Sequence, residues 1–317
     1  MKNTAFLFPG QGSQSVGMLD AWGTHPSVLE TLGEASDALS EDLGKLISSG
    51  TKEELSLTTN TQPVMLAAGV AAYRVWKAEG GQDPSVMAGH SLGEYSALVC
   101  AGALSLKDAA PLVRFRAQAM QDAVPVGVGA MAAVLGLASD KVIEGCAQVE
   151  RENPSECVQA VNFNDPLQTV IAGSVAGVNK ACEVLKAMGA KRALILPVSA
   201  PFHSTLMKPA ADKLKEKLEQ ATFKSPEIQV LNNVDVLIQT DPVKIKESLY
   251  RQAFSPVRWV ETISTMKSSG IEFTIECGPG KVLSGLSARI DNSLKSAPLY
   301  DPTSLGLVKE LLSTTSP

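Results

Sequence analysis

The stretch SVMAGHSLGEYSALVCA, residues 85–101, decides the fold of this chain. Residues 85–88 form a short apolar run that predicts a buried strand, and the small and apolar residues 94–101 predict a helix. Between them, residues 89–93 (GHSLG) have the G-x-S-x-G pattern of a nucleophile elbow. That pattern also arises by chance in glycine-rich chains, but here it has the strand before it and the helix after it that an elbow requires. We therefore expect an α/β fold with Ser91 exposed at a sharp strand-to-helix turn.

Strands and helices alternate on both sides of this turn. Upstream, Thr4–Phe8 predicts a strand, and residues 25–39 and 63–78 have helical periodicity. Downstream, helices are expected at residues 106–122, 208–220, 243–252 and 257–268, and strands at residues 229–232 and 273–276. This alternation is typical of a parallel sheet with helices on both faces. Beyond residue 298 the pattern is weak, and we expect a short helix there at most.

The middle of the chain has a different order of elements. Strands are predicted at residues 130–137, 157–162, 169–172 and 192–197, and helices at residues 139–149 and 175–188. The order β-α-β-β-α-β is that of the ferredoxin-like split βαβ arrangement. We therefore expect a large α/β unit built from residues 1–127 and 198–317, with a small ferredoxin-like subdomain inserted at residues 128–197.

Composition and charge exclude several classes of protein. The hydrophobic fraction of 44% and the charged fraction of 19% are ordinary for a globular chain of 317 residues. The net charge of -5 argues against non-specific nucleic-acid binding, which needs a basic face. The five cysteines show neither a CxxC pair nor metal-ligand spacing, so we expect buried, reduced thiols and no metal site.

No segment predicts secretion or membrane insertion. The apolar run at residues 4–8 is too short for the core of a signal peptide. The longest uncharged apolar stretch, near residues 123–138, contains a proline and three glycines and falls short of the ~20 residues of a membrane helix. We expect a cytoplasmic protein that does not enter the membrane.

A nucleophilic serine needs a general base, and the chain has only three histidines. His90 is adjacent to Ser91 and should point to the opposite face, as a buried histidine beneath the elbow. His25 lies in a polar stretch and is expected at the surface. His203 follows the apolar strand at residues 192–197, in the kind of loop where open α/β sheets place their sites. We therefore expect His203 to be the base.

Residue spacing does not identify the group that orients the histidine, nor a cation that could bind the substrate. The acidic residues between Ser91 and His203 resemble helix-start or turn residues, so the acceptor that orients the histidine can be a backbone carbonyl. Arg114 and Arg116 are two apart on a predicted helix and point to different faces, so one of them can turn inward and bind a substrate carboxylate. Spacing does not say which arginine this is, and an ordinary surface arginine is the alternative.

Four segments, in this order, resemble the bacterial malonyl-CoA:carrier protein transacylases of fatty acid synthesis. They are residues 8–14 (FPGQGSQ), 89–94 (GHSLGE), 201–204 (PFHS) and 276–280 (ECGPG). The resemblance extends through most of the chain, to about residue 289, and implies a hydrolase-like α/β core with an inserted ferredoxin-like subdomain. It further implies ping-pong transfer of a malonyl group from malonyl-CoA to the phosphopantetheine thiol of acyl carrier protein, through a malonyl-serine. No cofactor is implied beyond the CoA thioester, which is a substrate.

The resemblance also implies a role for individual residues. Ser91 would be the acylated nucleophile and His203 its base, while Gln11 and Leu92 would supply the backbone N–H groups of the oxyanion hole. Arg116 would bind the free malonyl carboxylate, and the main-chain carbonyl of Gln252 would orient the histidine.

Two more positions are implied with respect to the acyl group. Asn162 would line the cleft from the subdomain, and the ring of Phe202 would leave no room for the extra methyl of a methylmalonyl group. Ala117 departs from the family pattern, because many relatives have glycine there, and we expect little effect on the chemistry.

An acidic carrier protein would need a local basic patch on this acidic chain. The candidates are Lys180, Lys186, Lys191 and Arg192, for which a solvated helix face is the alternative. We expect a monomer. Two other functions share parts of the pattern, namely a serine thioesterase or esterase with the same elbow and a non-catalytic domain that binds acyl carriers.

Overall fold

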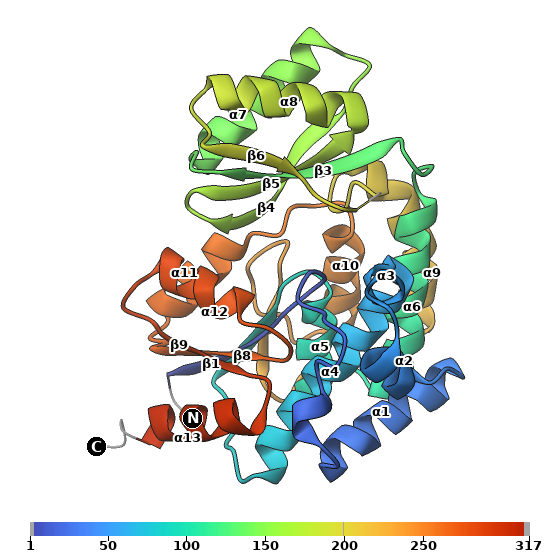
Figure 1. The fold of residues 1–317 in the computed structure, drawn as a ribbon, viewed down its shortest axis with the longest axis vertical. Coiled ribbons are helices and arrows are strands. Elements are labelled where there is room, and N and C mark those ends of the chain that lie inside the picture. Colours follow the sequence, from blue (N-terminus) through green and yellow to red (C-terminus); the bar gives the residue numbers. More distant parts are fainter. Residues whose placement is uncertain (1–2, 199, 314–317) are drawn as a thin grey trace.

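Two sheets organise the chain in the computed structural model, which describes residues 3–198 and 200–313 (Figure 1). Five strands form a parallel sheet in the order β7-β2-β1-β8-β9, and four strands form an antiparallel sheet in the order β4-β5-β3-β6. The strands are β1 (Thr4–Phe8), β2 (Val86–Gly89), β3 (Gly129–Leu135), β4 (Val158–Asp165), β5 (Gln168–Ser174), β6 (Arg192–Ile195), β7 (Gln229–Leu231), β8 (Phe273–Cys277) and β9 (Lys295–Leu299).

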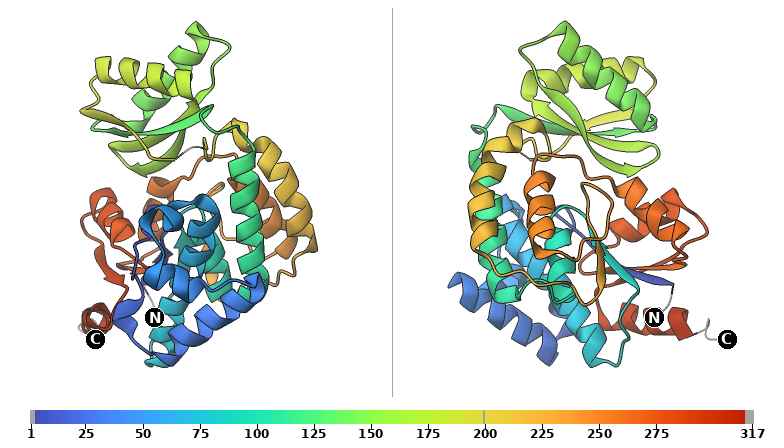
Figure 2. Two further views of the ribbon diagram at one scale, coloured as in Figure 1. Left: turned by 45° about the vertical axis from the view of Figure 1, so that its right-hand side comes forward. Right: turned by 180° about the vertical axis from the view of Figure 1, so that it is seen from behind.

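Helices cover both faces of the parallel sheet and one face of the antiparallel sheet (Figures 1 and 2). Within the described ranges, no helix is both long and apolar enough to cross a membrane. The helices are η1 (Asp20–Trp22), α1 (Pro26–Leu39), α2 (Leu43–Ser49), α3 (Lys52–Ser56), α4 (Thr58–Ala78), α5 (Gly93–Cys100), α6 (Leu106–Asp122), α7 (Ser139–Glu152), α8 (Val175–Ala187), η2 (Thr205–Met207), α9 (Lys208–Gln220), α10 (Pro242–Gln252), α11 (Trp259–Ser268), α12 (Val282–Ile290) and α13 (Pro302–Ser313).

Strand β1 shows why the parallel sheet is covered on both sides. Successive side chains of a strand point to opposite faces, and all five residues of β1 are buried. Phe6 belongs to the core that includes α4, where its ring meets Tyr73 at 6.0 Å and Trp76 at 5.6 Å. Leu7 belongs to a second core on the other face, shared with α11 and α12. A continuous apolar strand is therefore the expected sequence here.

The segment between β3 and β6 has the element order β3-α7-β4-β5-α8-β6, as the sequence predicts. Helices α7 and α8 pack on the face of this sheet that points away from the large unit (Figures 1 and 2). The backbone of β4 is also bonded to the segment before α11. Val257 donates its N–H to the Val161 oxygen at 2.8 Å, and Phe163 donates to the Val257 oxygen at 3.0 Å.

The expectation for the C-terminal segment was wrong. Residues 295–299 form the edge strand β9, paired in parallel with β8, and the helix α13 that follows has 12 residues. The strand was hidden because only Leu299 is fully buried, and because Pro298 is tolerated only at a sheet edge. The helix starts at Pro302 and is capped by Asp301, whose carboxylate accepts the Ser304 N–H at 2.6 Å. The short helices α2 and α3 were also missed.

Candidate active site

Ser91 lies at the turn between β2 and α5, in a left-handed conformation with φ of 52°. Both flanking glycines are needed for the close approach of backbone at this turn. A Cβ at Gly89 would lie 1.8 Å from the carbonyl carbon of Gly93, and one at Gly93 would lie 2.0 Å from the Phe8 oxygen. The turn therefore exposes the serine hydroxyl above the carboxyl ends of the parallel strands, at the start of α5.

His203 meets Ser91 from the loop that follows β6. Its Nε2 lies 2.7 Å from the Ser91 Oγ, and its Nδ1 lies 2.8 Å from the backbone oxygen of Gln252. Because a carbonyl can only accept, Nδ1 carries the proton and Nε2 has a lone pair for the serine hydroxyl. Burial, followed by the charge of Arg116, lowers the pKa of His203 to about 3. The imidazole is therefore neutral at physiological pH, and the lone pair of its Nε2 is free to accept the serine proton.

Arg116 turns inward from α6, while Arg114 turns outward. The Arg116 side chain is 1% exposed, and its guanidinium lies 5.6 Å from the centroid of the Tyr95 ring. It donates from Nη1 to the Gln62 Oε1 at 2.8 Å, and from Nη2 to the Gln252 Oε1 at 3.0 Å and the Ser91 Oγ at 3.1 Å. Arg114 instead forms a two-pronged ion pair with Glu41 at 2.8 and 2.5 Å. The structure thus brings Arg116, and not Arg114, to the Ser91 hydroxyl.

The side chain of Gln252 joins three groups of the site. It is fully buried at the end of α10. Its Oε1 accepts from Arg116, and its Nε2 donates to the Ser91 backbone oxygen at 3.0 Å and to the Glu94 Oε2 at 2.9 Å. The resemblance implied only the main-chain carbonyl of this residue, so the side-chain role was missed.

Asn233, which sequence reasoning also missed, clamps the elbow. Its Oδ1 accepts the Ser91 N–H at 2.7 Å, and its Nδ2 donates to the Gly89 oxygen at 2.7 Å. Its own N–H donates to the Glu94 Oε2 at 2.9 Å. A usable signal existed, since Asn233 comes directly after the predicted strand at residues 229–232, at the carboxyl end where open sheets place their sites.

Glu94 and Gln62 complete this buried polar network. Glu94 lies in the first turn of α5 and is 2% exposed, and burial raises the pKa of its carboxyl group to about 7. Gln62 lies on α4, where it is 2% exposed among apolar neighbours. A glutamine on an apolar helical face was the signal for Gln62, since a buried amide needs partners.

The structure places Gln11 and Leu92 on two loops that meet at the elbow. Gln11 follows β1, and Leu92 immediately precedes α5. Among the residues described, neither backbone N–H donates to a protein acceptor. Two free N–H groups of this kind, one of them at a helix N-terminus, suit a developing negative charge.

Phe202 and Asn162 are both buried, but they lie in different parts of the chain. Phe202 is 9% exposed and immediately precedes His203. Asn162 is 6% exposed, and it lies on β4 opposite Val257, at an irregularity in the pairing of β4 with β5.

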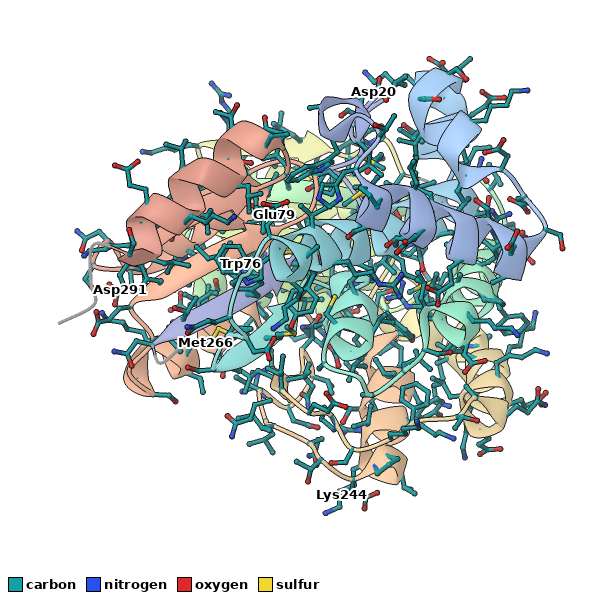
Figure 3. The ribbon with its side chains drawn as sticks, turned by 90° about the horizontal axis from the view of Figure 1, so that it is seen from below. Asp20, Trp76, Glu79, Lys244, Met266 and Asp291 are labelled. Carbon is teal, nitrogen blue, oxygen red and sulfur yellow. The ribbon has the colours of Figure 1, made fainter. Side chains whose placement is uncertain are left out.

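The other two histidines have structural contacts away from the Ser91 hydroxyl. His90 is half-buried, with its Nε2 2.8 Å from the Asn164 Oδ1 and its ring 5.4 Å from that of Trp259. His25 accepts the Ser27 N–H at 3.2 Å and so caps α1, and it lies 3.6 Å from the Glu79 carboxylate at the end of α4 (Figure 3). His25 therefore has a defined capping role where we expected only a surface residue.

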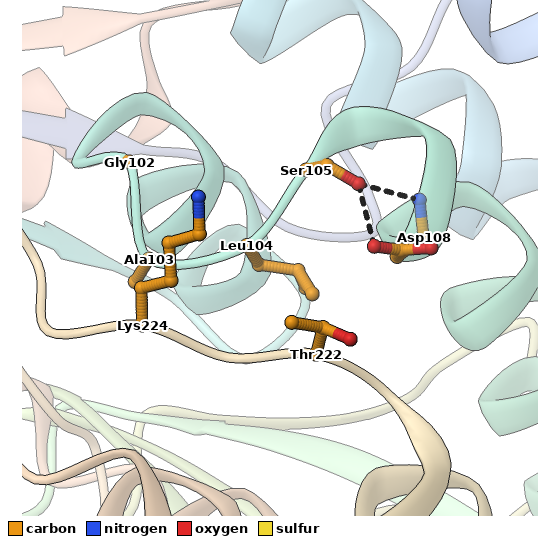
Figure 4. A pocket seen from close by; sticks show the side chains of 7 residues that line it. All are labelled: Gly102, Ala103, Leu104, Ser105, Asp108, Thr222 and Lys224. Atoms are coloured by element: carbon orange, nitrogen blue, oxygen red, sulfur yellow. Dashed lines mark hydrogen bonds between the residues drawn. The ribbon is translucent and has the colours of Figure 1, made fainter.

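A pocket of about 420 Å³ lies between the start of α6 and the segment after α9 (Figure 4). Its polar lining includes Ser105 and Asp108, but the Ser105 hydroxyl caps α6 by accepting the Asp108 N–H at 3.1 Å. Arg116 lies eleven residues beyond Ser105, roughly 16 Å along the helix axis. The pocket is therefore separate from the site around Ser91.

Comparison with known proteins agrees with this geometry. The sequence profile of the acyl transferase domain matches residues 5–310, so the fold and the site define an acyl transferase. The chain is 52% identical over 314 residues to the malonyl CoA-acyl carrier protein transacylase of Haemophilus influenzae, across 98% of this chain and 100% of the relative. The chain belongs to the family of malonyl CoA-acyl carrier protein transacylases.

Two solved structures illustrate the similarity. The acyl-carrier-protein S-malonyltransferase of Burkholderia pseudomallei is 59% identical, with a TM-score of 0.95 over 97% of this chain and 99% of the other. A malonyl-transacylase solved in complex with its type II PKS acyl-carrier protein is 48% identical, with a TM-score of 0.95 over 98% of this chain and 100% of the other.

Proposed function

We propose that this protein transfers the malonyl group from malonyl-CoA to the phosphopantetheine thiol of acyl carrier protein, in fatty acid biosynthesis. The observation that carries the proposal is the position of Arg116, a buried guanidinium 3.1 Å from a serine hydroxyl that is itself 2.7 Å from a neutral histidine. The serine and the histidine suit acyl transfer. The guanidinium suits an acyl group that ends in a carboxylate.

In the first half-reaction, the Nε2 of His203 takes the Ser91 proton as Oγ attacks the thioester carbon of malonyl-CoA. The carbonyl oxygen becomes an oxyanion that accepts from the N–H groups of Gln11 and Leu92. The carbon–sulfur bond then breaks, His203 returns the proton to the departing CoA thiolate, and malonyl-Ser91 remains. Throughout, the Gln252 carbonyl holds the imidazole in the required tautomer.

The second half-reaction reverses these steps with a different thiol. His203 takes the proton of the phosphopantetheine thiol, whose sulfur attacks the ester carbon of malonyl-Ser91. The oxyanion again accepts from Gln11 and Leu92, and Ser91 leaves as its proton is returned by His203. One site thus serves both substrates in turn, which defines a ping-pong mechanism.

The acyl carboxylate has a second effect, on the base. The positive charge of Arg116 contributes to the lowered pKa of His203. A malonyl carboxylate paired with Arg116 would offset that charge and raise the pKa of His203 towards its ordinary value. The correct acyl group therefore improves the base that the reaction needs, which an acetyl group would not do. We propose that Phe202 limits the space beside the malonyl C2 and that Asn162 lines the cleft from the small sheet.

For the carrier protein, we propose a basic patch made of Lys191 and Arg192, at the start of β6. Both are exposed. The two other candidates lie on α8, on the face of the small sheet away from the parallel sheet (Figure 2). Lys180 is also paired with Glu183 at 3.4 Å. A carrier bound there would have the small sheet between itself and Ser91, so Lys180 and Lys186 are less suitable.

We also propose names for the two units. The strand order β4-β5-β3-β6 supports a ferredoxin-like subdomain at residues 128–197, and the elbow above a parallel sheet supports a hydrolase-like core at residues 1–127 and 198–317. Residues 1–2, 199 and 314–317 of these ranges lie outside the described residues. We propose that the protein is cytoplasmic. We also propose that it is a monomer, which sedimentation of the purified protein would test.

The decisive experiment is mass spectrometry of the protein mixed with malonyl-CoA. One malonyl adduct is expected on Ser91, stable without an acceptor thiol and discharged by holo-acyl carrier protein. The Ser91→Ala variant serves as the control and should show no adduct. Rapid loss of the adduct to water would instead indicate a thioesterase, and full function of Ser91→Ala would indicate a binding domain.

A further inference from the structure

Arg116 is a buried cation whose hydrogen bonds, within the described residues, go only to neutral groups. Its partners are the amide oxygens of Gln62 and Gln252 and the hydroxyl of Ser91. Five other arginines have a carboxylate within 4 Å, and each of them is far more exposed. They are Arg74, Arg114, Arg251, Arg258 and Arg289. A buried charge without compensation strongly destabilises a fold, so a negative charge is needed near Arg116.

The side-chain amide of Gln252 lies between Glu94 and this cation and is hydrogen-bonded to both. The Glu94 Oε2 accepts from the Gln252 Nε2 at 2.9 Å, and the Gln252 Oε1 accepts from the Arg116 Nη2 at 3.0 Å. The amide is therefore bonded to the carboxylate at one end and to the guanidinium at the other. Each charge polarises the amide in the sense that strengthens the other bond.

We propose that Glu94 is the counter-charge of Arg116, held one amide away so that the guanidinium stays open to the carboxylate of an acyl group. This inference rests on the proposed function, since malonyl is the acyl group concerned. In direct contact with Arg116, a carboxylate would occupy the fork that binds the substrate. From behind Gln252, Glu94 compensates the charge, while the guanidinium itself contacts only neutral groups and its Nε has no hydrogen-bond partner among the described residues. Glu94 is thus a positioning residue that acts through Gln252.

A count of charges predicts how Glu94 affects selectivity. With acetyl bound, Arg116 and Glu94 balance; with malonyl bound, the site carries one net negative charge. Without the charge of Glu94, malonyl gives a balanced site and acetyl leaves the cation uncompensated. Because unbalanced buried charge is unfavourable, Glu94 weakens the preference for malonyl over acetyl.

The test compares malonyl-CoA and acetyl-CoA as donors for wild type and for Glu94→Gln. Glutamine can place an acceptor oxygen where the Glu94 Oε2 accepts from Asn233 and Gln252, so it removes the charge and keeps both bonds. The assay is run at pH 8, because burial raises the pKa of Glu94 to about 7. We expect the malonyl-to-acetyl ratio of kcat/KM to rise on the order of tenfold in the variant. An unchanged or lower ratio, including an equal fall with both donors, would overturn the inference.

Two further measurements separate charge from structure. In an Arg116→Gln background, Glu94→Gln should leave the ratio unchanged, and a change there would also overturn the inference. Melting temperature needs no substrate: Glu94→Gln should lower it, and the double variant with Arg116→Gln should recover most of the loss. If Glu94→Gln does not fold, a folded double variant supports the inference and an unfolded one overturns it. A wild type that takes no malonyl would refute the proposed function, and the melting temperatures would still decide the role of Glu94.

Discussion

Gln252 holds His203 through its backbone and the rest of the site through its side chain. The Gln252 carbonyl oxygen lies 2.8 Å from the His203 Nδ1, while the amide of the same residue contacts Arg116, the Ser91 backbone and Glu94. One residue at the end of α10 therefore couples the orientation of the His203 ring to that of the Arg116 guanidinium. The two roles can be separated by substitution, because only one of them needs the side chain.

Gln252→Ala should keep the histidine oriented and disturb the arginine. The loss of three side-chain hydrogen bonds at about 1 kcal/mol each should lower malonyl transfer on the order of 100-fold. Transfer from acetyl-CoA should fall less, because it does not use the Arg116 fork. Steady-state kinetics with both donors provides the measurement, and Gln220→Ala, an exposed position on α9, is the control. Equal losses with both donors would show that the substitution acts on His203 instead.

Arg116→Ala should change the choice of acyl group. Loss of a charge-assisted, two-pronged contact of about 3 kcal/mol should lower kcat/KM for malonyl-CoA on the order of 100-fold and raise the relative activity towards acetyl-CoA. Arg114→Ala is a matched control two residues away, since it removes a half-exposed ion pair with Glu41 worth at most about 1 kcal/mol. Unchanged selectivity in Arg116→Ala would refute the role of Arg116 in recognising the carboxylate.

Asn233→Ala should loosen the nucleophile elbow. The substitution leaves the Ser91 N–H and the Gly89 oxygen without their partner. We expect a loss of about 2–3 kcal/mol in the free energy of unfolding and a lower kcat. Denaturant unfolding and the rate of malonyl-Ser91 formation are the measurements. The neighbouring Asn232→Ala removes a turn contact to the Asp235 N–H and should slow acylation far less; equal slowing would contradict the clamp.

The lowered pKa of His203 predicts a pH dependence of stability. Its pKa is lowered from 6.5 to about 3 in the folded protein, so below pH 6.5 the unfolded chain binds a proton that the folded protein excludes. The folded state therefore loses stability as pH falls. Relative to His203→Ala, wild type should lose about 1.6 kcal/mol between pH 6.5 and pH 5. Urea unfolding at both pH values measures this difference. Burial raises the pKa of Glu94 to about 7, so its contribution to stability increases as pH falls. Because Glu94 is present in both proteins, this contribution cancels to first order in the difference between them.

Charge reversal at Lys191 and Arg192 should weaken the encounter with the carrier protein. The double variant Lys191→Glu/Arg192→Glu should raise KM for holo-acyl carrier protein several-fold and leave the kinetics of malonyl-CoA unchanged. Lys244→Glu is the control, because Lys244 projects from the start of α10 at another edge of the molecule (Figure 3). Equal effects on both substrates would argue against the patch, as would equal effects of the control.

The order of the elements and the position of Ser91 at the strand-to-helix turn could be predicted because both depend on short-range sequence. The elbow needs glycine within two residues of Ser91 on each side, since backbone approaches there to distances that no Cβ allows. The apolar runs of β1 and β2 are continuous because both faces of a parallel sheet are covered. Choosing His203 needed only the short list of histidines. The apolar pattern did not predict β9, because only Leu299 of this edge strand is fully buried.

Apart from His203, the side chains that contact Ser91 could not be derived from residue spacing, and the tertiary structure decided them. Arg114 and Arg116 have the same side chain and lie on the same helix. The packing of α6 against α4 is what turns Arg116 inward. Asn233 and Gln252 follow Ser91 by more than 140 positions, and they meet it because the carboxyl ends of parallel strands and the end of α10 converge at one edge of the sheet. Hydrogen bonds between residues so far apart in the sequence depend on their distance in space, and the spacing of residues along the chain does not predict that distance. By itself, the sequence determined a serine at an elbow; the fold decided which cation, which amides and which carboxylate surround it.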